Sequence, residues 1–211
     1  MKYLKVCFIL SVALSLSSFV FQSKDDFNKK DLFKSFISEF NKVKLPNTLT
    51  LKSGYERVKK YEGGQLGEFS NNSIIIESVN NSSNVLGMDY VDFIPEINSG
   101  MMSRIGPAKY SAESLLASNK KYISVIYSES EPFNYTIKNY TLATFNNSGT
   151  LINAKHIGEA SVDSYMEMSI SKNMSFTIND ISINQETNQN KVENTKKMFI
   201  TPDGKILTHN I

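Results

Sequence analysis

The C-terminal half of this chain alternates apolar and polar residues in short runs that are separated by turn residues. "FNYTIKNYTLATF" is followed by "NNSG" and "TLINAKHI", "SVDSYMEMSI" by a turn near Lys172 and "SFTIND", and "KKMFI" by "TPDG" and "KILTHNI". A period of two places successive side chains on opposite faces of a strand. The sequence therefore predicts three successive β-hairpins.

The turn "TPDG" also predicts a register. Its proline suits the second position of a type I turn, and Gly204 suits the left-handed conformation that follows such a turn in a hairpin. We therefore expect Thr201 opposite Lys205. This register places Phe199 opposite Leu207 on one face of the sheet.

The turn "NNSG" repeats this pattern, with Gly149 in the left-handed position and Asn146 opposite Thr150. Continued along the hairpin, the register places Tyr140 opposite His156. His156 is one of two histidines in the chain. We expect a half-buried side chain there rather than a catalytic one, because no partner residue completes a site.

Two further features belong to this half. The apolar phase shifts within "SFTINDISI", which predicts a β-bulge at Asn179–Asp180. The polar run "NQETNQNKVENTK" lacks apolar spacing and predicts a surface loop or a mobile tip.

The N-terminal half has one amphipathic helix, with Phe33, Phe36, Ile37 and Phe40 on one side. "NSIIIESV" predicts a strand, "AESLLAS" suggests a helical turn, and the glycines of Gly63–Gly67 predict a loop. The predicted fold class is α+β, with an N-terminal amphipathic helix packed on a largely antiparallel, hairpin-rich β-sheet.

Residues 1–22 have the layout of a secretory signal peptide: two lysines, an apolar run and an abrupt return to charge. We expect residues 23–211 to form a single β-rich domain that is exported to the periplasm, the cell surface or the medium, with no membrane span after cleavage. Cys7, the single cysteine, lies inside the apolar run, so we expect neither a lipoprotein nor a disulfide.

Charge and motifs exclude several classes of function. Removal of Lys2 and Lys5 from 23 basic residues leaves 21, which match the 21 acidic residues. A neutral chain lacks the basic patch that nucleic-acid binding needs. No nucleophile motif is present, and His156 and His209 are isolated. The sequence identifies no catalytic residue, no cofactor site and no metal ligand.

Several of these features resemble a loose group of small exported bacterial proteins of unknown function. They are a helix with the spacing "FxxFxxxF" before "LPNTL", then "IGPAKY", "YISVIYSES", "LATFNNSGTLINAKHIG" and "MFITPDGKI". The resemblance implies an exported β-rich fold and no particular activity.

Three functions remain open. The first is a non-catalytic exported protein that binds a protein or glycan partner through the irregular segment Asp92–Tyr110 and neighbouring strand edges. The second is a hydrolase of envelope or glycan material that uses paired carboxylates, either Glu129 with Glu131 or Asp89 with Asp92. The third is a carrier of an apolar ligand between the helix and the sheet.

Overall fold

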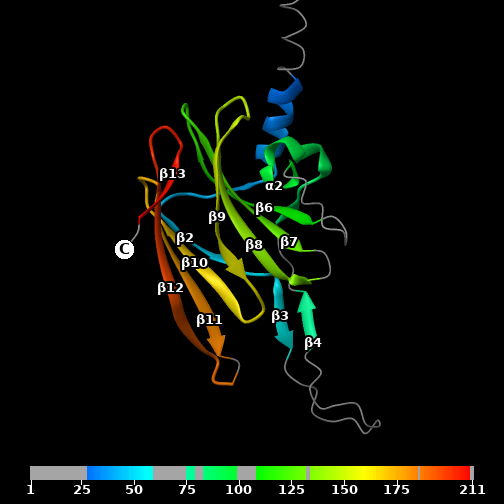
Figure 1. Ribbon diagram of the computed structural model, residues 1–211, viewed down its shortest axis with the longest axis vertical. Helices are drawn as coiled ribbons and strands as arrows, with labels where there is room; N and C mark the ends of the chain where they lie inside the picture. Colours follow the sequence, from blue (N-terminus) through cyan, green and yellow to red (C-terminus); the bar gives the residue numbers. More distant parts are fainter. Residues whose placement is uncertain are drawn as a thin grey trace, which may run out of the picture.

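The computed structural model describes residues 28–58, 75–78, 83–98, 108–131, 134–184 and 186–209 (Figure 1). These residues form mainly β-sheet, with antiparallel pairing in almost every ladder. The predicted largely antiparallel, hairpin-rich sheet is thus confirmed, and the described fold is mainly β. The predicted signal peptide, the Gly63–Gly67 loop and residues 99–107 of the irregular segment lie outside the described residues.

Two sheets contain most of the described strands. Sheet A has the order β1-β6-β7-β8-β9, with β5 also paired to β6, and sheet B has the order β13-β12-β11-β10-β2. β3 and β4 form a separate pair that projects from one end of the molecule in Figure 1. The strands are β1 (Asn41–Lys42), β2 (Asn47–Leu51), β3 (Tyr55–Val58), β4 (Ile75–Ser78), β5 (Asn84–Val85), β6 (Lys109–Ser118), β7 (Ile123–Glu131), β8 (Asn134–Phe145), β9 (Leu151–Ala160), β10 (Ser164–Ile170), β11 (Ser175–Asn184), β12 (Gln189–Ile200) and β13 (Ile206–His209).

Sheets A and B face each other across an apolar core. Alternate residues of both sheets point into this core, as period-two alternation requires. Its fully buried members include Ile126, Leu142, Met166, Met168 and Ile178. We call the faces that meet here the inner faces of the two sheets.

The outer face of sheet A has a second apolar core. A helix over residues 28–38, the 3-10 helix η1 (Met88–Phe93) and the short helix α2 (Pro95–Asn98) contribute to it. The Phe33 ring lies 5.4 Å from the Phe145 ring of β8 and 5.2 Å from the Phe93 ring of η1, measured between centroids. Sheet A is therefore buried on both faces, whereas the outer face of sheet B is open.

The three predicted hairpins are present as β8–β9, β10–β11 and β12–β13. Thr201 N–H donates to the Lys205 carbonyl over 2.9 Å, and Phe199 lies opposite Leu207 as predicted. Gly204 has a φ of +87°, the left-handed conformation that the turn "TPDG" requires. The second turn repeats this geometry, since Asn146 N–H donates to the Thr150 carbonyl.

A β-bulge is present next to the predicted position, at a register shift between Asp180 and Ile181. The extra residue, however, belongs to the partner strand. Asp180 lies opposite Asn194 and Ile181 opposite Val192, so Glu193 is the unpaired residue.

Two local predictions are wrong. Residues 112–118 form part of strand β6 rather than a helical turn. The polar run after residue 184 is largely strand β12, which pairs with β11 from Gln189 onward. Residues 189–195 are exposed along their whole length, so this part of the strand has no buried face that would impose alternation.

Candidate functional site

The outer face of sheet A has a cluster of polar side chains at the end that is not covered by the N-terminal helix. Strand pairing defines its floor: Tyr127 of β7 lies between Ala112 of β6 and Thr141 of β8, and His156 of β9 completes this row. Directly opposite residues of antiparallel strands share a face. The row therefore brings together side chains from four strands.

Glu96 of α2 contacts this row on the outer face of sheet A. The Tyr127 hydroxyl donates to Glu96 Oε2 over 2.6 Å, and the Thr141 hydroxyl donates to Oε1 over 3.3 Å. Phe93 and Ile94, just before α2, are buried in the outer core. The carboxylate therefore sits on a segment that the core already holds in place.

A second tyrosine–carboxylate pair lies beside the first. Tyr110 and Glu129 are directly opposite each other on β6 and β7, and the Tyr110 hydroxyl donates to Glu129 Oε1 over 3.0 Å. Burial is the main cause that raises the pKa of Tyr110 and of Tyr127, and the neighbouring carboxylates raise both further. Both phenols therefore stay protonated at neutral pH and act as donors.

This arrangement bears on the carboxylate pairs proposed from the sequence. Glu129 is paired with Tyr110, and the pKa of Tyr110 is also raised by Glu96, a residue that the sequence did not single out. Asp89 and Asp92 are exposed in η1, and the side chain of Glu131 lies outside what the structure describes. Glu96 and Glu129 each accept a hydrogen bond from a buried phenol, and for Glu96 this contact joins α2 to the sheet.

The two histidines do not meet. His156 lies opposite Thr141, not Tyr140, because Ile152 is an extra residue of β9 between the turn and His156 and shifts the register by one. His156 is exposed rather than half-buried. His209 belongs to sheet B, opposite Lys197. No group of three or more His, Cys, Asp or Glu side chains within the described residues is arranged to hold a metal ion.

A polar group that the sequence analysis missed lies on the inner face of sheet A. Lys138 Nζ lies 3.2 Å from Glu113 Oε1, and the Ser128 hydroxyl donates to the same oxygen over 2.6 Å. Lys138 is only 6% exposed. The signal was present in "KNYTL", where Lys138 shares a strand face with the apolar residues Tyr140 and Leu142.

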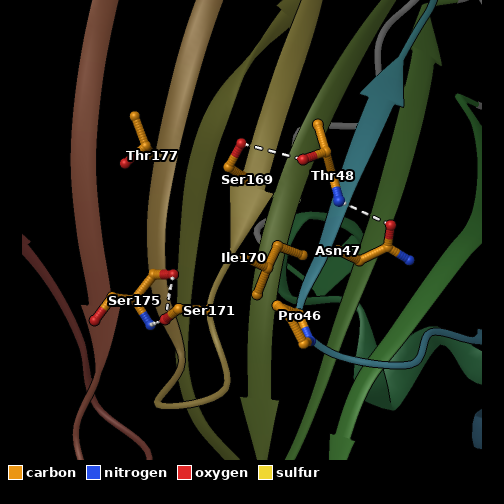
Figure 2. A pocket seen from close by; sticks show the side chains of 8 residues that line it. All are labelled: Pro46, Asn47, Thr48, Ser169, Ile170, Ser171, Ser175 and Thr177. Atoms are coloured by element: carbon orange, nitrogen blue, oxygen red, sulfur yellow. Dashed lines mark hydrogen bonds between the residues drawn. The ribbon is translucent and has the colours of Figure 1, made fainter.

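Sheet B has an open hollow on its outer face (Figure 2). Its volume is about 530 Å³, and it lies over β2, β10, β11 and the turn between the last two. Uncharged side chains line it: Pro46, Asn47, Thr48, Ser169, Ile170, Ser171, Ser175 and Thr177. Figure 2 shows the hydroxyls of Thr48 and Ser169 pointing toward each other, at 3.3 Å.

Comparison with protein-family models, with curated proteins and with solved structures finds no match for this chain. Within the part of the chain that the structure describes, no helix is both long enough and apolar enough to cross a membrane.

Proposed function

We propose that the chain is an exported, non-catalytic protein that binds a partner protein in the periplasm or at the cell surface. The binding surface is the segment from β5 to α2, residues 84–98, which overlaps the start of the surface expected from the sequence. The observation that carries the proposal is that this segment is firmly anchored and nevertheless displays exposed apolar side chains.

The anchors lie on the inward side of the segment. Leu86, Phe93 and Ile94 are buried in the outer core, and Leu86 N–H donates to the Tyr110 carbonyl over 2.9 Å. At its far end, Glu96 accepts hydrogen bonds from Tyr127 and Thr141. A surface held in this way loses little conformational entropy on binding.

The outward side has the composition of a contact surface. Val85 and Met88 are 56% and 61% exposed, and the acidic residues Asp89 and Asp92 lie beside them. Exposed methionine adapts to the shape of a partner, and exposed apolar groups bordered by charge are typical of protein interfaces. We propose a partner with an apolar contact patch that is bordered by basic residues.

The helix over residues 28–38 is, in this proposal, a permanent cover of sheet A. The contact between the Phe33 and Phe145 rings supports this role, as does the hydrogen bond from the Tyr90 hydroxyl to Glu39 Oε1. The helix is then part of the scaffold that holds η1 rather than a partner-binding element.

The test is capture of the partner from an envelope extract by the tagged chain. Deletion of residues 84–98 would expose the outer core, so point substitutions are required. We expect Met88→Asp, alone or with Val85→Asp, to abolish capture of the species bound by the unchanged chain. Val192→Asp is the matched control, because Val192 is 55% exposed on sheet B. If the double variant Val85→Asp, Met88→Asp still captured the partner, the proposal would be contradicted.

A further inference from the structure

The hollow on the outer face of sheet B offers hydrogen-bonding groups that the protein itself does not use. Within the described residues, Thr177 Oγ1, Ser175 Oγ and Asn47 Nδ2 have no hydrogen-bond partner, while Asn47 Oδ1 accepts from Thr48 N–H. Thr48 and Ser169 share a single hydrogen bond between two hydroxyls, which leaves one of their protons for another acceptor. The hollow therefore offers a ligand both hydrogen-bond donors and hydrogen-bond acceptors.

The charge of the hollow restricts its ligand. Every residue that lines it is uncharged. Lys197 lies opposite Thr177 on this face but does not line the hollow. Within the hollow itself, a phosphate, a carboxylate or an ammonium ion would lose its hydration without gaining a counter-charge, which is unfavourable. The hollow therefore complements a neutral ligand with many hydroxyl groups.

An apolar platform continues from the hollow along the same face. Phe199 of β12 lies opposite Ser175 and is 37% exposed, and Leu207 of β13 lies opposite Phe199 and is 43% exposed. Opposite residues share a face, so the Phe199 side chain projects on the side of the sheet that bears the hollow. Pro46 and Ile170 add apolar surface within the hollow itself.

We propose that this face of sheet B binds a neutral saccharide chain. A sugar ring presents hydroxyls at its edge and C–H groups on its faces, which match the hydroxyls of the hollow and the Phe199 platform. Sheet B has five strands, and a strand spacing of about 4.8 Å gives a track of about 19 Å from β2 to β13. The site is separate from the proposed protein-binding segment of residues 84–98, so either can exist without the other.

The test uses the intact exported chain on an array of neutral, uronic-acid and sulfated oligosaccharides, followed by calorimetric titration of the best neutral ligand. We expect neutral glycans to bind, and we expect Phe199→Ala to weaken binding at least tenfold. Thr177→Val keeps the shape of the side chain and removes its hydroxyl, and we expect a loss of the same order. Val192→Ala, also on an exposed part of β12, is the matched control and should bind as the unchanged chain does.

Three outcomes would overturn the proposal. They are the absence of binding to any neutral glycan, equal or stronger binding of acidic glycans, and binding that both Phe199→Ala and Thr177→Val leave intact. Urea unfolding of each variant separates loss of the site from loss of the fold, and Thr177→Val, at a partly exposed strand position, retains a β-branched side chain.

Discussion

Single residues at the hairpin turns determine how the N-terminal helix meets sheet A. Gly149 has a φ of +85°, and a Cβ atom built on it would lie 2.7 Å from Cγ of Phe33. Both the backbone conformation and the close approach favour glycine at this turn. The turn "NNSG" therefore does more than reverse the chain, because it also provides the surface against which Phe33 lies.

We predict that Gly149→Ala lowers the free energy of unfolding by about 1–3 kcal/mol, since it combines an overpacked contact with a strained turn. Gly87→Ala is the control. Gly87 has a φ of −72°, and a Cβ atom added to it would have no heavy atom within 4 Å. Urea unfolding of both variants measures the difference. Equal stability of the two variants would show that the turn does not depend on glycine.

At the scale of elements, the hairpins were predictable because their turns and their alternation agree. Strand β6 was not, because Glu113 and Leu116 are extra residues relative to β7 and interrupt the alternation twice. The resulting spacing of Ala112, Leu115 and Leu116 imitates a helix. Strand β12 was not predictable for a different reason. Its residues 189–195 are all exposed, so apolar and polar residues need not alternate there.

The candidate site was predictable only in part. The sequence predicts Glu129 as one carboxylate of a pair, Tyr110 as the end of the irregular segment, and His156 as a half-buried residue without a catalytic role. Strand pairing brings these three residues to one face of sheet A. Glu96 was not singled out, because its contact with Tyr127 joins residues 31 positions apart. That contact depends on the docking of α2 against the outer core, which no local pattern encodes.

The buried group of Ser128, Glu113 and Lys138 joins three neighbouring strands, β7, β6 and β8. We predict that Lys138→Met lowers the free energy of unfolding by about 3–5 kcal/mol, because it leaves the Glu113 carboxylate without its cation in a buried position. The double variant with Glu113→Leu should recover most of this loss, since it removes both charges. Urea unfolding of the single and double variants measures the coupling.

The exposed ion pair of Lys34 and Asp31 is the control for the Lys138 and Glu113 variants. Its N–O distance is shorter, 2.8 Å, yet both side chains are exposed. Water screens such a pair, so Lys34→Met should change stability far less than Lys138→Met does. A similar loss in both variants would mean that burial does not determine the strength of these ion pairs.

For the whole molecule, the decisive feature is that sheet A is buried on both faces while sheet B is buried on one. Buried polar side chains within sheet A therefore generally need partners in the protein, although the buried Ser124 hydroxyl has none. Tyr127 does so on the outer face, through Glu96, and Tyr140 does so on the inner face, where its hydroxyl donates to the Lys52 carbonyl over 2.5 Å. Both contacts require a protonated phenol.

This requirement predicts a loss of stability in alkaline solution. Burial raises the pKa of Tyr127 and of Tyr140 well above the usual 10.0, and the Glu96 and Glu113 carboxylates, respectively, raise them further. Below pH 10 each phenol is protonated in both the folded and the unfolded chain. Above pH 10 only the unfolded chain releases the proton, so the free energy of unfolding falls by about 1.4 kcal/mol per pH unit for each tyrosine.

Urea unfolding between pH 9 and about pH 11.5 measures this slope, and the two tyrosines can be separated by substitution. Tyr127→Phe and Tyr140→Phe each remove one of the protons that couple folding to pH, so each variant should have a shallower slope than the unchanged chain. The two reductions should add, because the residues contact different partners on opposite faces of sheet A. If both variants kept the original dependence of unfolding free energy on pH, the loss of stability in alkaline solution would not come from Tyr127 and Tyr140.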